Sequence, residues 1–302
     1  MSYRRLLAAL LTAVAIPIAT AAVYAQLSLS QGQGQGQGQG QEPRPRIWVG
    51  GDRGFGRVRR EPANWADRAN FTGQYNFCRV FYSSDRGENG GMGWWTDYPG
   101  ADNNFSVRLA ELTYVNVKMK PDGQPDHLVL RLTDPLIYRC PVLHMEDVGT
   151  VRFSDEEVVS LRDYLLKGGF LYVDDFWGTL AWEQWASEIG RVLPPHKYPI
   201  IDIPRDHPIL HTLYDVKEVP QVPSINRWYN MGGGTSERGD DSPYVNFRAI
   251  QDEQGRLVVV MTHNTDISDT WEREGENKEY FDRFSPDGYA VGVNITLYAM
   301  TH

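Results

Sequence analysis

The segment 154–189 constrains the fold of this chain more than any other part. Ser154 and Glu157 have the spacing of a capping box, in which each side chain accepts a backbone N–H at the start of a helix. Gly168-Gly169 then provides a helix stop, because glycine tolerates the left-handed conformation found there. The apolar run Phe170–Val173 is typical of a strand covered on both faces. A helix, a buried strand and a second helix in this order predict a parallel sheet with right-handed crossovers.

Shorter segments extend this prediction to the rest of the chain. Apolar and β-branched runs between turn residues predict further strands at 75–82, 115–119, 128–132, 142–145, 247–250 and 257–262. Helical spacing predicts helices at 103–112 and 288–300. We expect Asp174-Asp175 to end the buried strand and Thr179 to cap the next helix. The predicted fold class is α/β, with a mostly parallel sheet and helices on both faces.

The N-terminus has the pattern of a secretory signal peptide. Arg4 and Arg5 precede the apolar stretch 6–22, and small residues lead to an expected cleavage after Ala25. The alternative is an uncleaved membrane anchor, because the apolar stretch approaches the length that spans a bilayer. The prediction is an exported chain, periplasmic or extracellular after cleavage.

The segment that follows the predicted signal, 26–70, is expected to lie outside the folded core. It contains a Gln/Gly repeat at 31–41, which has no apolar face and predicts a flexible tether. The rest is an irregular lead-in rich in proline, arginine and glycine. The division is therefore a signal peptide at 1–25, a tether and lead-in at 26–70, and one α/β domain at 71–302.

The charge balance bears on the partners of the chain. Its formal net charge of -9 argues against a nucleic-acid partner. The expected partner is an unknown envelope protein, or a small-molecule or glycan ligand. Contact with a membrane is expected only through the N-terminal segment, if that segment is not cleaved.

Cys78 and Cys140 are the only cysteines, and both lie in the exported part. An oxidising compartment permits a disulfide between them. Each also lies in a strand-like run, where a small buried thiol is the commoner outcome. The sequence leaves both alternatives open.

Five motifs in a fixed order carry a family resemblance. They are GWWTDYPGADNNF at 93–105, RFSDEEV at 152–158, GGFLYVDDFWG at 168–178, DHPIL at 206–210 and YAVGVNITLYAMT at 289–301. Together they resemble the bacterial family called domain of unknown function 4159, over residues 71–302. The resemblance implies a flavodoxin-like sheet similar to that of class I glutamine amidotransferases, and it implies no established activity.

The amidotransferase likeness can be tested at one turn. Class I amidotransferases carry a cysteine nucleophile on a sharp strand-to-helix turn, with a histidine and an acidic residue as partners. If the strand Phe170–Val173 occupies that place, the turn here is Asp174-Asp175-Phe176-Trp177-Gly178, without cysteine. Glutamine hydrolysis by that triad is therefore not expected.

Polar side chains after several predicted strands define a candidate pocket. Ligands in open α/β sheets bind at the carboxyl ends of the strands, near the point where the strand order reverses. The candidate residues are Trp95, Asp97, Tyr98, Asp102, Asn104, His144, Glu146, Asp174, Asp175 and His207. Carboxylates held close together can supply a general acid, although helix caps and turns are an equally ordinary use for them.

The pattern of these residues suggests two further uses. His144 and Glu146 with Asp175 or His207 would make a mixed nitrogen and oxygen metal site, but the ordinary use of such a histidine is a structural hydrogen bond. The aromatic residues Trp94, Trp95 and Tyr98 would either stack a ligand or plug the sheet edge. The sequence therefore predicts no metal and no cofactor.

The function predicted from these observations is non-catalytic. We expect an exported amidotransferase-like domain that binds a ligand or partner at the cell envelope. The alternative is a hydrolase that uses pocket carboxylates on a glycan or another envelope polymer.

Overall fold

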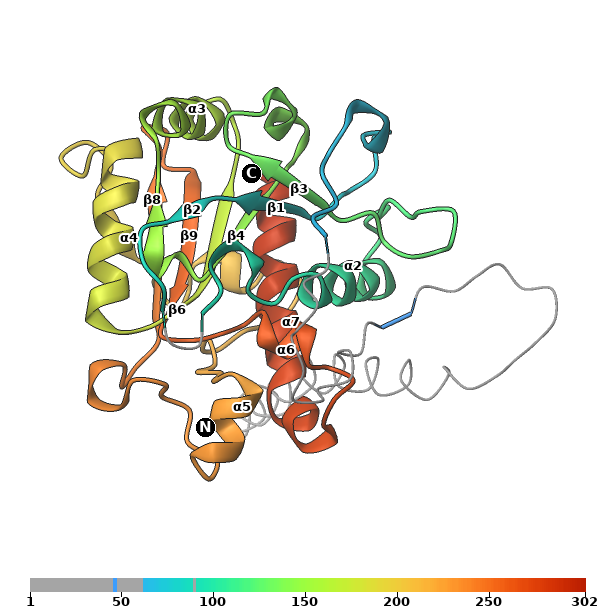
Figure 1. The fold of residues 1–302 in the computed structure, drawn as a ribbon, viewed down its shortest axis with the longest axis vertical. Helices are drawn as coiled ribbons and strands as arrows, with labels where there is room; N and C mark the ends of the chain where they lie inside the picture. Colours follow the sequence, from blue (N-terminus) through green and yellow to red (C-terminus); the bar gives the residue numbers. More distant parts are fainter. Residues whose placement is uncertain (1–45, 48–61, 89–90) are drawn as a thin grey trace, which may run out of the picture.

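A seven-stranded sheet forms the centre of the molecule (Figure 1). The computed structural model describes residues 46–47, 62–88 and 91–302, and the expected signal peptide and Gln/Gly repeat lie outside them. In spatial order the strands are β3 (Leu128–Arg131), β1 (Cys78–Phe81), β4 (Leu143–Glu146), β6 (Leu171–Phe176), β9 (Leu257–His263), β8 (Asn246–Gln251) and β7 (Ile200–Asp202). The first five are mutually parallel, and β8 pairs antiparallel with both β9 and β7. The prediction of a mostly parallel α/β sheet is confirmed.

Helices cover both faces of this sheet, as predicted. The longer helices are α2 (Gly100–Leu112), α3 (Asp155–Leu166), α4 (Gly178–Val192) and α7 (Lys278–Thr301), with short α5 (Ile225–Asn230) and α6 (Asp269–Glu272). Single turns of 3-10 helix are η1 (Arg68–Asn70), η2 (Gly93–Trp95), η3 (Pro135–Arg139), η4 (Val148–Thr150), η5 (Pro208–Leu210) and η6 (Gly239–Asp241). A second, two-stranded sheet joins β2 (Ser83–Ser84) to β5 (Val151–Arg152).

Alternation of side chains along the strands builds two apolar layers. In β6, Tyr172 packs into the layer formed with α2 and α7. Its neighbours Leu171 and Val173 pack into the layer formed with α3 and α4. Because successive side chains on a strand point to opposite faces, β6 is covered on both sides and is central, as its apolar sequence predicts.

The segment that begins at Ser154 forms the predicted capped helix. The Glu157 amide donates to Ser154 Oγ at 3.2 Å, and the Ser154 amide donates to Glu157 Oε2 at 2.8 Å. Two of the backbone amides at the start of α3 are therefore satisfied by nearby side chains.

The strand after this helix is longer than predicted. β6 continues through Asp174 and Asp175 to Phe176, with an irregularity in its pairing with β9 between Val173 and Phe176. The expected cap at Thr179 is also wrong, because α4 begins at Gly178.

Asp241 replaces Thr179 as the capping side chain. Its carboxylate accepts from the Thr179 amide at 3.0 Å and from the Thr179 hydroxyl at 2.5 Å. The helix start is thus held by a residue 62 positions away, which a local pattern cannot show.

Two other segments differ from expectation. Val115–Met119 forms no strand and contributes only isolated bridges, one of them between Tyr75 and Val117. Residues 62–70 of the expected lead-in are described and contact the sheet, although the folded domain was expected to begin at Phe71. Within it, Asn64 O accepts from the Val129 amide at 2.9 Å and the Ala66 amide donates to Val129 O at 3.0 Å, so this segment pairs with the margin of β3.

Cys78 and Cys140 form a disulfide. The bridge joins β1 to the residue that follows η3, and both cysteines are buried. Of the two alternatives that the sequence left open, a disulfide and two buried free thiols, the structure has the disulfide. Among the described residues, no helix has both the length and the apolar character needed to cross a bilayer.

Candidate functional site

The carboxyl ends of β1, β4, β6 and β9 lie at one edge of the sheet. The order of the strands reverses between β1 and β4, because the chain passes from β1 to β3 on one side and then to β4 on the other. Ligands of open α/β sheets bind outside such a point. A cavity of about 590 Å³ lies at this edge, a size suited to a small molecule.

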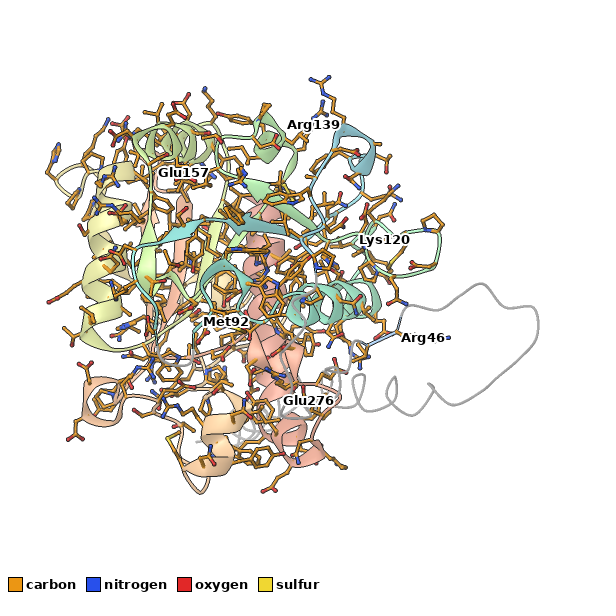
Figure 2. All side chains as sticks on the ribbon, in the orientation of Figure 1. Arg46, Met92, Lys120, Arg139, Glu157 and Glu276 are labelled. Carbon is orange, nitrogen blue, oxygen red and sulfur yellow. A yellow bond between two sulfur atoms is a disulfide. The ribbon has the colours of Figure 1, made fainter. Side chains whose placement is uncertain are left out.

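Five aspartates from four regions of the chain line this cavity, which we call the acidic pocket. Asp97 lies between η2 and α2, Asp147 follows β4, and Asp175 lies near the end of β6. Asp266 and Asp269 follow β9. The facing wall is formed by α5 and the segment 231–238. Figure 2 shows Met92, another pocket residue, toward the end of the molecule opposite Arg139 and Glu157.

Three pocket aspartates have a left-handed backbone. The φ angles are 61° at Asp97, 53° at Asp147 and 52° at Asp175, and Asn264 after β9 has 65°. Aspartate and asparagine tolerate this region better than most residues, but each such position still costs roughly 1–3 kcal/mol. Strained backbone concentrates where a site requires a particular side-chain direction. Here Asp147, Asp175 and Asn264 lie at the carboxyl ends of β4, β6 and β9, whereas Asp97 lies in the loop before α2. The three aspartates line one cavity.

Burial raises the pKa of the pocket carboxyl groups. Burial is the largest cause at Asp147 and Asp269, and the pKa of each rises to about 7. The pKa values of Asp97, Asp175 and Asp266 also lie well above the usual value, first through burial and then through neighbouring carboxylates. The pocket therefore holds protons, or requires another positive charge, near neutral pH.

The closest carboxylates are those of Asp97, Asp266 and Asp269. One oxygen from each lies within 4.8 Å of the others, and all three residues are buried. Two unit charges at that separation repel by roughly 3 kcal/mol at an effective dielectric constant of about 20. These three residues are the only cluster of potential metal ligands within the described part of the chain.

Arginines on the pocket wall compensate part of the negative charge. Arg273 Nε lies 3.0 Å from Asp269 Oδ1, and Arg238 Nη2 lies 3.0 Å from Glu88 Oε1. Arg227 lies 3.8 Å from Glu237. The lining includes seven carboxyl groups and three guanidinium groups, so the pocket is rich in hydrogen-bond acceptors.

A buried ion pair lies behind the pocket. Arg79 donates to both oxygens of Asp102, with Nε to Oδ1 at 2.9 Å, and to the Thr96 carbonyl at 2.9 Å. Arg79 Nη2 is 3.9 Å from Glu146 Oε1. Neither oxygen of Glu146 has a hydrogen-bond partner among the described residues, and burial followed by the charge of Asp174 raises its pKa to about 8.

Only Asp97 and Asp175 of the ten predicted site residues line the acidic pocket. The other eight lie elsewhere: Trp95, Tyr98, Asp102, Asn104, His144, Glu146, Asp174 and His207. Asp174 is used structurally, because its oxygens accept from the Thr262 hydroxyl at 2.5 Å and from the Ser268 amide at 2.8 Å.

The two predicted histidines are also structural. His144 is buried and stacks on Phe77 with ring centres 3.9 Å apart. His207 accepts from the Ile209 amide at the start of η5 and packs near Tyr298. The structure therefore does not bring His144 and His207 together with Asp175 as a metal site.

The aromatic loop packs over the sheet margin. Trp95 and Tyr98 are buried against Val129, and Trp94 lies between Phe81 and Tyr98. Asn104 donates to the Trp271 carbonyl at 2.8 Å and so ties α2 to α6. The plug interpretation of this loop is confirmed, and a different tryptophan, Trp177, lines the pocket.

Sequence reasoning omitted three pocket aspartates from its candidates. Asp147 lies one residue beyond Glu146, and Asp266 lies three residues beyond the end of β9. The same strand-end rule that selected Asp97 would have selected both. Asp269 lies in α6 and had no such signal, because the short helix was not predicted.

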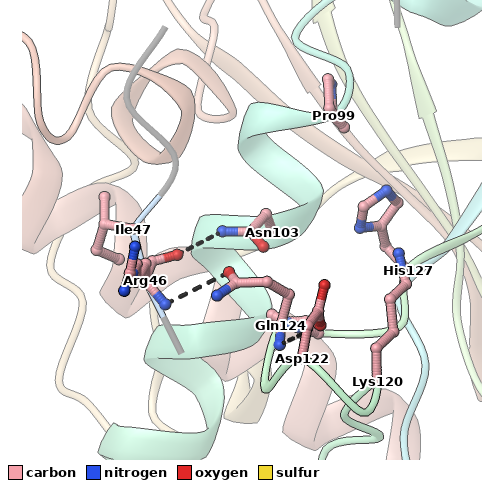
Figure 3. A pocket seen from close by; sticks show the side chains of 9 residues that line it. Arg46, Ile47, Pro99, Asn103, Lys120, Asp122, Gln124 and His127 are labelled. Carbon is pink, nitrogen blue, oxygen red and sulfur yellow. Dashed lines mark hydrogen bonds between the residues drawn. The ribbon is translucent and has the colours of Figure 1, made fainter. Parts of the chain in front are cut away.

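A second cavity, of about 420 Å³, lies beside the start of α2 (Figure 3). Arg46 lies across it, and its carbonyl accepts from Asn103 Nδ2 at 3.0 Å. Its amide lies 3.4 Å from Gln124 Oε1. Arg46 therefore forms part of the wall of this cavity.

The fold and the cavity together describe the class of protein. It is an α/β domain with an acid-lined pocket where the strand order reverses, between β1 and β4. Residues 76–300 match the model of a protein family described as Domain of unknown function (DUF4159). The chain belongs to this family. No similar protein was found among the curated proteins.

Proposed function

We propose that this chain is an exported, non-catalytic domain that binds a small polar ligand at the cell envelope. The observation that carries the proposal is the acidic pocket at the switch point, with three strained aspartates directed toward one cavity. The scaffold would be flavodoxin-like and amidotransferase-like, since the five parallel strands follow the order 2-1-3-4-5 when numbered among themselves.

The disulfide supports both parts of this proposal. Disulfides persist in oxidising compartments, so the Cys78–Cys140 bridge is what an exported chain would carry. The same bridge consumes both sulfurs, and a thiolate nucleophile needs a free one. The turn after Val173 presents Asp175 to the pocket instead.

The side chains that line the acidic pocket determine which functional groups a ligand must carry. Ionised carboxylates accept hydrogen bonds and donate none, so a ligand must supply donors. Hydroxyl groups and amines do this, and an amino sugar from an envelope glycan offers both. Trp177 at the pocket wall adds an apolar surface against which a sugar ring can pack.

Calorimetric titration of the purified protein tests the binding proposal. Glucosamine oligomers and neutral glucan oligomers should bind, while uronic-acid oligomers of the same length should not. Asp175→Asn should weaken binding at least about tenfold, a loss of roughly 1.4 kcal/mol. Asp163→Asn is the matched control, because Asp163 lies on α3 and pairs with Lys167 at 2.8 Å. Equal affinity of both variants, or a preference for the acidic oligomer, would contradict the proposal.

The rival function is a carboxylate-dependent hydrolase. It is favoured by one observation, namely that Asp147, whose pKa is about 7, shares the pocket with Asp175. Two carboxyl groups in different protonation states can act as acid and base. Release of reducing ends from a glycan, lost in Asp147→Asn, would establish this alternative in place of binding alone.

Export has its own test. Mass spectrometry of the periplasmic or extracellular fraction should find a chain that begins near Gln26. A chain that retains Met1 in the cytoplasm would overturn the export part of the proposal.

A further inference from the structure

We propose that Asp97, Asp266 and Asp269 bind a divalent cation of the calcium type within the acidic pocket. The inference deepens the proposed function and rests on it for the role of the ion, because the cation would lie where the ligand binds. The existence of the ion site can nevertheless be tested without any ligand.

The spacing of the three carboxylates suits such an ion. One oxygen from each lies within 4.8 Å of the others. Calcium binds oxygen at about 2.3–2.6 Å, so two ligands on opposite sides of the ion are separated by about 5 Å. Oxygens from three carboxylates at this spacing can therefore surround one ion, and hard divalent cations prefer carboxylate oxygen.

A second observation points to a missing partner. The Asp97 side chain is 6% exposed, and its Oδ2 has no hydrogen-bond partner among the described residues. Buried polar atoms are normally satisfied, so an orphaned carboxylate oxygen facing a cavity indicates an absent group. The other two members of the set, Asp266 and Asp269, lie in the segment after β9, and one oxygen of each lies within 4.8 Å of an Asp97 oxygen.

The neighbouring protein groups do not supply that partner to Asp97. Asp269 Oδ2 accepts from the Ile225 amide at 2.7 Å and from the Tyr280 hydroxyl at 3.0 Å. Arg273 contacts Asp269, Glu272 and Glu276. These contacts fix Asp269 in place, whereas the ion pairs of Arg273 are made with carboxylates other than Asp97.

The proposed ion also has a place in ligand binding. Calcium takes 6–8 oxygen ligands, and three carboxylates leave several positions to water or to a ligand. Hydroxyl oxygens of a sugar can fill those positions because the site lies in an open cavity of about 590 Å³. The bound cation would thus offset the negative charge of the acidic pocket and would allow a neutral ligand to bind there.

The test uses the metal alone. Purified protein is treated with EDTA, dialysed and titrated calorimetrically with CaCl₂, and with MgCl₂ in a parallel experiment. We expect saturable binding of one Ca²⁺ per chain, weaker binding of Mg²⁺, and a rise in the melting temperature with added Ca²⁺. Asp97→Asn should weaken Ca²⁺ binding at least about tenfold, while Asp163→Asn should bind as the wild type does.

The variants keep the inference falsifiable. Asparagine tolerates the left-handed backbone at position 97, and circular dichroism establishes that the variant is folded. If Asp97→Asn does not fold, Asp266→Asn takes its place. Absence of saturable binding of either metal, or equal Ca²⁺ affinity in wild type and variant, would overturn the ion site.

The two proposals fail separately. Ca²⁺ binding that is lost in Asp97→Asn supports the ion site even if no oligosaccharide binds. Oligosaccharide binding in EDTA by a protein that takes up neither metal would overturn the ion site and leave the proposed function standing.

Discussion

Arg79 shows how a single residue organises the region behind the acidic pocket. Its guanidinium is fully buried and donates to Asp102 and to the Thr96 carbonyl. These bonds hold the start of α2 and the loop that carries Asp97 against β1. A buried charge is tolerated only while its partners remain, so this ion pair makes the loop sensitive to substitution.

Asp102→Asn should destabilise the protein strongly. The substitution leaves the Arg79 charge buried with its principal counter-charge removed, a loss that typically costs about 3–5 kcal/mol. Urea unfolding followed by circular dichroism measures the change. Asp163→Asn should shift the free energy of unfolding by less than about 0.5 kcal/mol, and equal stability of the two variants would refute a structural role for the ion pair.

Glu146 makes stability depend on pH. Its pKa is raised from 4.5 to about 8 in the folded state, mainly by burial. The folded protein therefore binds this proton more tightly than the unfolded chain does. The stability contributed by protonated Glu146 is complete below the unfolded pKa and is lost as the pH rises through about 8.

Glu146→Gln should remove this dependence. Relative to wild type, the variant should gain on the order of 1–3 kcal/mol between pH 5 and pH 9, because glutamine never ionises. Thermal unfolding across that range measures it. Parallel profiles for the two proteins would show that the pKa of Glu146 is the same in the folded and unfolded states.

At this scale the sequence predicts some site residues and misses others for identifiable reasons. Asp97 and Asp175 follow strand-like runs, and both face the pocket. Asp174 is drawn away by Thr262 and Ser268, residues about 90 positions later in the chain. Such non-local partners decide which of two adjacent aspartates reaches the cavity, and no local pattern contains them.

Elements governed by local chemistry are the ones that sequence predicts well. The start of α3 depends on two side chains within four residues, and it forms as expected. The end of β6 depends instead on pairing with β9 and on a left-handed residue at Asp175. Aspartate is depleted in strands, so propensity alone ends this strand three residues early.

Ser154→Ala should therefore weaken the fold through the helix start alone. Loss of the capping hydroxyl should cost about 1 kcal/mol, measured by urea unfolding. Ser154→Asp keeps an acceptor at the same place and should restore most of the lost stability. If the alanine variant is as stable as wild type, the capping box contributes nothing measurable.

The whole molecule is held by a covalent bond as well as by its core. The disulfide closes a loop of 62 positions in sequence between β1 and the residue after η3. A cross-link of this span removes loop entropy from the unfolded chain and is worth roughly 4 kcal/mol in the chain-entropy model.

Cys78→Ala combined with Cys140→Ala should lower the free energy of unfolding by about 3–4 kcal/mol. Both residues are buried, so alanine also avoids leaving a polar group in the core. Denaturant unfolding of the variant, beside wild type with and without reductant, measures the loss. A variant as stable as oxidised wild type would show that the bridge contributes nothing.

The class of fold was predictable at this scale because helix and strand patterns alternate along much of the chain. The antiparallel β7 was not, because residues 192–245 are interrupted repeatedly by proline and glycine and β7 is three residues long. The burial of the central strands on both faces could be predicted from their apolar sequence. The wall of the pocket that faces the strand ends could not, because it comes from the segment 192–245, which has the weakest helix and strand pattern.

The pairing of Asn64–Ala66 with β3 has a consequence for how the molecule meets its neighbours. An outermost strand offers unpaired N–H and C=O groups on which a second chain can build. Here residues Asn64–Ala66 of the lead-in occupy part of the outer edge of β3, because they pair with Val129. A fragment trimmed to begin at Phe71 would uncover it, and self-association through β3 would follow. We therefore expect the lead-in to limit edge-to-edge association through β3, and size-exclusion chromatography of the trimmed fragment measures the change.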